Sequence, residues 1–67
     1  MRWERIRNEW SRLSPKAKSV WPRVSDAELQ VVAGRRDRLI DKVRDAYHLP
    51  HEEAEKEVDV WADGLKA

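Results

Sequence analysis

Apolar residues recur at steps of three and four along most of this chain, which is the spacing of one face of an α-helix. The first run of such residues begins at Trp3, and its spacing continues through Ala17 and Val20. No alternation typical of a β-strand stands out. We therefore predict an all-α fold. The residues that define the stripes are Trp3, Ile6, Trp10 and Leu13, then Leu39, Ile40, Val43 and Tyr47, and finally Ala54, Val58 and Trp61.

Proline divides the first apolar run. The Ser14-Pro15 pair suits an N-cap and a first helical position better than a helix interior. We expect a break or kink there, followed by a short helix that ends at Trp21, because Pro22 disfavours helical geometry in the residue before it.

The boundaries of the later helices are marked by capping residues and by glycine and proline. Ser25 and Glu28 have the spacing of a capping box, so a helix begins near Ser25. We interpret Gly34 as a pivot into the next helix, since glycine inside a helix costs about 1 kcal/mol relative to alanine. That helix ends before Pro50, which begins a last helix that runs to about Ala62.

These boundaries predict four or five short helices in a single domain over residues 1–67. A chain of this size buries only ~60% of the surface that its unfolded form exposes. Because it has no cysteine, neither a disulfide nor a thiolate metal site can reinforce the core. We expect one core that contains Trp10, Leu39, Val43, Tyr47, Val58 and Trp61.

The charges are unevenly distributed although the net charge is only +1. Residues 1–23 carry seven Lys or Arg against two Glu, a balance of +5, whereas residues 51–67 carry two against six, a balance of −4. Residues 24–50 are balanced. We expect the basic and acidic ends to lie near each other, within one molecule or between two, so the chain is a monomer or a weak homo-oligomer.

Few residues have the pattern of a catalytic or metal site. His48 and His51 are separated by Pro50, which prevents one regular helix from presenting both to a metal. A Ser/His/Asp set, a glycine-rich phosphate loop and a nucleophilic cysteine are missing from the sequence. We therefore expect no catalytic residue, no cofactor and no metal, and we predict that the protein is not an enzyme.

Nucleic-acid binding is the alternative that the charges suggest. The arginines at positions 38 and 44 have Asp41 within one turn, so that helix face should neutralise itself. The basic N-terminal face has fewer acidic neighbours, and any binding there would be weak, non-specific and dependent on counterion release. Its candidate contacts are Arg5, Arg12, Lys16 and Lys18.

The chain has no run of about 20 apolar residues that would cross a membrane. Residues 1–20 also lack the apolar centre of a signal peptide. We expect a cytoplasmic protein without a transmembrane segment.

The segments "GRRDRLIDKVRDAY" and "AEKEVDVW", with two tryptophans eleven residues apart upstream, resemble the CsbD-like family of small bacterial proteins. The resemblance covers roughly residues 8–62. It implies four or five short helices packed as two crossed helical hairpins, similar to a SAM domain, in proteins associated with general stress responses. The positions that carry it are Trp10, Trp21, Gly34, Asp37, Leu39, Val43, Tyr47, Ala54, Glu55, Lys56, Glu57 and Trp61.

The resemblance implies no known catalytic residue. It therefore favours a non-enzymatic stress-response protein with a protein-interaction or protective role and an unidentified protein partner. The chain departs from the family pattern at Pro15, Pro22 and His48, where the family frequently has glycine. Histidine adopts the left-handed backbone conformation less cheaply than glycine.

Overall fold

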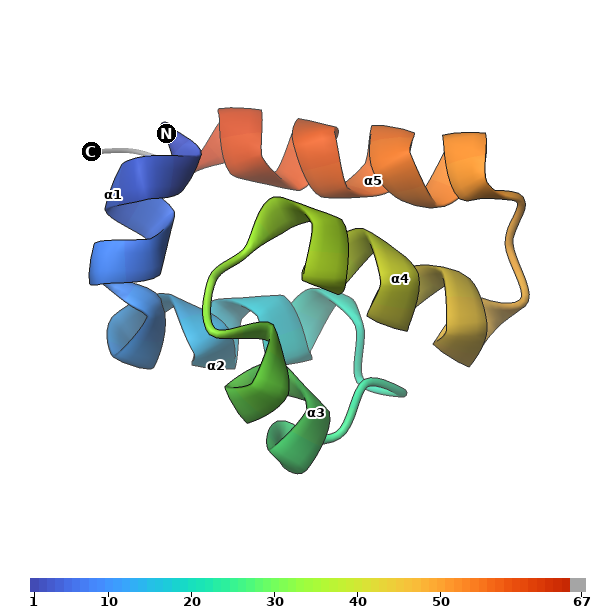
Figure 1. Cartoon of the computed structure of the whole chain (residues 1–67), viewed down its shortest axis with the longest axis horizontal. Helices are drawn as coiled ribbons and strands as arrows, with labels where there is room; N and C mark the ends of the chain where they lie inside the picture. The colour runs from blue at the N-terminus through green and yellow to red at the C-terminus, as the bar shows by residue number, and fades with distance from the viewer. Residues whose placement is uncertain (66–67) are drawn as a thin grey trace.

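The computed structural model describes residues 1–65, which form five helices and no strand (Figure 1). The all-α prediction is confirmed. The helices are α1 (Trp3–Asn8), α2 (Trp10–Val20), α3 (Asp26–Val32), α4 (Arg36–Tyr47) and α5 (His51–Gly64).

The helices α4 and α5 form an antiparallel hairpin and have the most extensive contact in the structure. The short α3 packs against α2 on one side and α4 on the other. Figure 1 shows α2 and α5 running in opposite directions, with α1 standing across the C-terminal end of α5. This arrangement brings the first and last helices together.

The prediction of a helix break at Ser14-Pro15 is wrong. The boundary lies at Glu9, and α2 continues through Pro15. Proline at this position removes the hydrogen bond that its N–H would donate to the carbonyl of Ser11. Ser11 is exposed, so water can bind that carbonyl, while the buried residues Leu13 and Ala17 hold both sides of Pro15 against the core. Tertiary burial thus outweighs the local preference of proline.

The predicted capping box opens α3. The hydroxyl of Ser25 accepts a hydrogen bond from the backbone N–H of Glu28 at 3.1 Å, and the Glu28 carboxylate accepts one from the Ser25 N–H. At the other end, Ala33 and Gly34 both have positive φ, 51° and 76°. Gly34 lies between α3 and α4, as expected for a pivot. A Cβ there would lie 2.6 Å from the Cα of Arg7, so only glycine lets α1 approach this turn.

Fourteen buried apolar residues make one core. Of the six residues expected there, Trp10, Leu39, Val43 and Val58 are buried, whereas Tyr47 and Trp61 are half-buried and pack against it. The core is larger than that set, because all five helices and the turn between α2 and α3 add buried residues. The additional members are Ile6, Leu13, Ala17, Trp21, Val24, Leu29, Val32, Ile40, Ala54 and Ala62.

The N terminus lies at the C-terminal end of α5. The ammonium group of Met1 donates to the carbonyl oxygen of Ala62 at 2.9 Å, which places a positive charge at the negative end of the helix dipole. The indole rings of Trp3 and Trp61 pack beside this contact, 6.5 Å apart between centroids. The basic and acidic ends of the chain therefore meet within one molecule.

Candidate functional site

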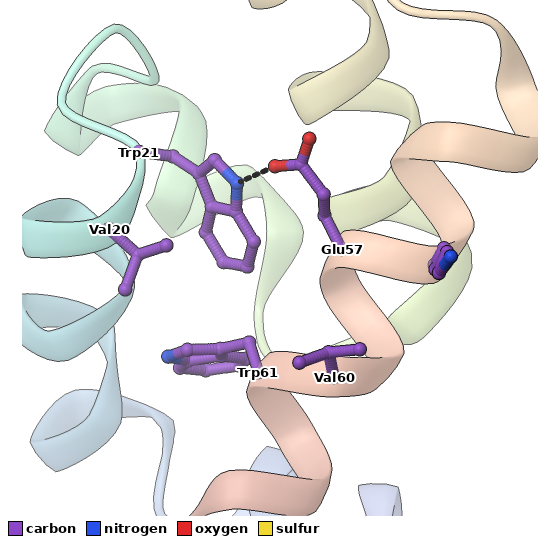
Figure 2. Close-up of a pocket in the computed structure, with 6 residues that line it drawn as sticks. Val20, Trp21, Glu57, Val60 and Trp61 are labelled. Atoms are coloured by element: carbon purple, nitrogen blue, oxygen red, sulfur yellow. Dashed lines mark hydrogen bonds between the residues drawn. The ribbon is translucent and has the colours of Figure 1, made fainter.

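An apolar groove of about 430 Å³ lies between the end of α2 and the middle of α5 (Figure 2). Val20 stands on the α2 side, and Val60 stands on the α5 side. The indole rings of Trp21 and Trp61 lie between these helices. The lining residues are Val20, Trp21, Lys56, Glu57, Val60 and Trp61.

Both valines of the groove are left uncovered by the fold. Val20 has 51% of its surface exposed, and Val60 has 64%. Val20 continues the apolar spacing of its helix in the sequence, but its side chain is not part of the core. The α2 helix ends at this residue, and the stripe that is buried consists of Trp10, Leu13 and Ala17. Large apolar side chains exposed together mark interaction surfaces more often than isolated ones do.

Trp61 is held in place by three other tryptophans. Its ring centroid lies 6.5 Å from that of Trp3, 6.4 Å from that of Trp10 and 5.5 Å from that of Trp21. The last two pairs have the edge-to-face geometry that aromatic quadrupoles favour. Trp61 therefore presents a fixed apolar surface to the groove.

Hydrogen bonds fix two of those neighbouring rings. The indole N–H of Trp10 donates to the carbonyl oxygen of Leu29 at 2.8 Å, and that of Trp21 donates to Glu57 Oε1 at 3.2 Å (Figure 2). The second bond joins the end of α2 to α5. It links the two walls of the groove.

The four predicted nucleic-acid contacts do not form a set of free cations. Arg5 and Arg12 both bind the carboxylate of Glu9, Arg5 through its Nε at 2.7 Å. The hydrogen bond from Arg5 holds the pKa of Glu9 below its usual range. The Lys18 ammonium donates to the carbonyls of Pro22 and Val24, and Lys16 is exposed. Arg5 and Arg12 thus share one acidic neighbour, and nucleic-acid contact through these four residues stays a prediction.

Of the two arginines of α4 that were expected to have Asp41 as a neighbour, one pairs with it. Arg44 pairs with Asp41 at 3.4 Å, but Arg38 donates to the backbone carbonyl of Val31 instead. Arg36 makes two hydrogen bonds to Asp59 on α5, at 2.8 and 2.9 Å. These bonds lower the pKa of Asp59 and raise that of Arg36. Sequence reasoning missed this pair because its members are 23 positions apart.

Within residues 1–65, no cluster of three or more His, Cys, Asp or Glu side chains is arranged to hold a metal ion. His51 lies 3.8 Å from Glu55 in the same helix, and His48 is exposed at the end of α4. None of the five described helices combines the length and apolar character needed to cross a bilayer.

The fold and the groove define a small all-α protein with an apolar groove beside two exposed valines. The chain belongs to the UPF0337 family, which is CsbD-like, as the sequence resemblance indicated. It is 37% identical over its whole length to a UPF0337 protein of Nitrosomonas europaea, of which the match covers 71%. A UPF0337 protein of Pectobacterium atrosepticum is 39% identical over 85% of this chain and 83% of its own.

UPF0337 protein YjbJ of Escherichia coli O6:H1 is 35% identical over 78% of this chain and 75% of its own length. No family model matches the chain. No solved structure matches it. The names of these relatives assign the family and state no activity.

Proposed function

We propose that this chain is a non-enzymatic, cytoplasmic protein of bacterial stress responses that acts by binding a polypeptide through the groove between α2 and α5. The stress setting is supported by the resemblance to the CsbD-like family. The binding mode is supported by one observation above all: Val20 and Val60 stand uncovered on the two rims of a groove that contains Trp61.

The energetics of the groove favour a binding role. Fully burying a valine side chain is worth ~1.5 kcal/mol or more relative to leaving it exposed. Tryptophan is enriched among the residues that dominate binding energies at protein interfaces. Trp61 is already held by three other rings. A partner that covers it therefore costs little additional side-chain conformational entropy.

The rim of the groove favours a polypeptide over a purely apolar ligand. Lys56 and Glu57 stand beside the apolar centre, and Glu57 is exposed although it accepts a bond from Trp21. An apolar centre with a charged rim is the usual composition of a protein interface.

Weak, non-specific nucleic-acid binding is a second candidate function, favoured by the charge balance of +5 in residues 1–23. It has less support than groove binding, because Glu9 occupies two of its four proposed contacts, Arg5 and Arg12. Lys16 would then carry most of the binding. This nucleic-acid binding should disappear at moderate salt.

The two valines at positions 60 and 31 allow a matched test. Val31 is 58% exposed on α3 and does not line the groove, so Val31→Asp adds the same charge to a different surface. A strain deleted for this gene would be complemented with the parent, Val60→Asp or Val31→Asp, and survival measured after osmotic, heat and oxidative stress. Our proposal predicts that only Val60→Asp fails to restore survival.

Two outcomes would contradict the proposal. Equal complementation by Val60→Asp and the parent would show that the function does not need the groove. A deleted strain that survives every stress as well as its parent would remove the stress role. Circular dichroism of both variants serves as the folding control.

A further inference from the structure

The two walls of the groove carry opposite charges. The α2 helix has three basic residues and no acidic one, whereas α5 has six acidic residues and one lysine. Lys16 lies one turn before Val20 and is exposed, and Asp63 lies one turn after Val60 and is also exposed. The helices α2 and α5 run in opposite directions (Figure 1). Since Lys16 precedes Val20 on α2 and Asp63 follows Val60 on α5, the two charges lie toward the same end of the groove on opposite walls.

Neither of these two charges is neutralised within the described part of the chain. Among residues 1–65, no ion pair includes Lys16 or Asp63. One end of the groove therefore carries a cation on the α2 wall and an anion on the α5 wall, whereas the α5 residues that line the groove itself include both a cation, Lys56, and an anion, Glu57. A partner that complements the groove must place an anion opposite Lys16 and a cation opposite Asp63.

A second copy of the chain supplies that arrangement. If two copies face each other about a two-fold axis that runs along the groove, α2 of each copy lies against α5 of the other. A two-fold axis across the groove would instead place α2 against α2 and α5 against α5, with like charges opposed. Electrostatic complementarity thus selects one of the two face-to-face arrangements.

We propose that the groove binds a second copy of this chain about a two-fold axis along the groove. In this dimer, Val20 packs against Val60 of the second copy, and Lys16 lies opposite Asp63 of the second copy. Each contact occurs twice, as in any isologous interface. The inference rests on the proposed function, because it names the polypeptide that occupies the groove.

The dimer is weak and concentration-dependent. A stable interface buries ~800 Å² on each partner, which would be a large share of the 4493 Å² that this chain exposes. The groove covers much less than that, so we expect a Kd of roughly 0.1 mM. The net charge of +1 per chain opposes association very little.

Sedimentation equilibrium from micromolar to millimolar concentrations at low salt tests the inference. The average mass should rise with concentration from 8.0 kDa toward twice that value. Val60→Asp should weaken association at least tenfold, and Val31→Asp should leave it within about twofold of the parent. A chain that stays monomeric at millimolar concentration, or a dimer that is indifferent to Val60→Asp, overturns the proposal.

Charge swaps test the arrangement of the two copies. Lys16→Glu alone places two anions at each contact, and Asp63→Lys alone places two cations there, so each variant should dimerise several-fold more weakly than the parent. Mixing the two variants restores both pairs in a heterodimer, and so does the double variant in a homodimer. Failure of both rescues overturns the two-fold axis along the groove.

The results also separate this inference from the proposed function. A monomeric chain whose Val60→Asp variant still fails to protect stressed cells would overturn the second copy as occupant and leave the groove as a binding site for another protein. A dimer whose loss has no effect on survival would support the inference and contradict the stress role.

Discussion

Arg36 on α4 holds Asp59 on α5 through two parallel hydrogen bonds, from Nε to Oδ1 at 2.8 Å and from Nη2 to Oδ2 at 2.9 Å. Such bidentate pairs are the strongest that arginine makes with a carboxylate. Glu55 adds a further contact to the same guanidinium at 3.5 Å. The pair connects the two helices of the α4–α5 hairpin.

The Arg36–Asp59 pair makes stability depend on pH in acid. The hydrogen bond from the Arg36 guanidinium holds the pKa of Asp59 below its usual value. The pair therefore contributes its full stability above the pKa of Asp59 in the unfolded chain, ~3.9. This stability is lost as the pH falls through the lower pKa of Asp59 in the folded chain. Both side chains are about two-fifths exposed, so solvent limits this contribution to roughly 0.5–1 kcal/mol.

Asp59→Asn should therefore lower the melting temperature at pH 7 and pH 5, and its difference from the parent should shrink between about pH 4 and pH 2. Thermal melts followed by circular dichroism would measure this. Asp45→Asn is the control and should change the melting temperature less, since that side chain is 68% exposed and its one ion pair within residues 1–65 is with its neighbour Arg44. An Asp59→Asn deficit that is as large at pH 2 as at pH 7 would show that the pair is not its source.

His48 ends α4 in the left-handed conformation, with φ of 54°. A residue with a Cβ costs about 1 kcal/mol more than glycine in this conformation. We predict that His48→Gly raises the free energy of unfolding by about 1 kcal/mol, measured by urea denaturation. His48→Ala keeps the Cβ and should give no gain. Equal effects of the two changes would mean that the imidazole, and not the backbone, sets the stability at this cap.

The two glycines of the chain should differ sharply in their tolerance of alanine. At Gly34 the added Cβ would meet the backbone of Arg7 at 2.6 Å, and φ is 76°. Gly34→Ala should cost roughly 2 kcal/mol or more, since backbone cannot move aside as a side chain can. At Gly64 a Cβ would meet nothing within 4 Å. Gly64→Ala should be within about 0.5 kcal/mol of the parent, and comparable losses at both positions would refute the close approach of α1.

Much of the helical fold could be predicted from the sequence, because periodicity and capping are local signals. The capping box at Ser25 and the pivot at Gly34 are examples. The end of the first helix could not be predicted, since the buried face of α2 overrides the local preference of Pro15. Such an outcome depends on tertiary packing, which spacing along the chain does not contain.

The groove was beyond the reach of sequence reasoning for a related reason. Val20 lies on an apolar stripe, and nothing local distinguishes it from the buried Ala17 three residues before it. Which apolar residue stays uncovered depends on how α5 packs against α2. The charge asymmetry, by contrast, was visible in the sequence, although its cations turned out to have partners such as Glu9.

Site-specific cross-linking in living cells tests most directly whether the groove binds a polypeptide. A photoreactive benzoylphenylalanine would replace Val60 in one strain and Val31 in another, and the strains would be irradiated under stress. We predict that position 60 gives a cross-linked product of twice 8.0 kDa whose peptides all come from this chain, and that position 31 gives none. No protein cross-linked at position 60, or the same products at both positions, would contradict the account.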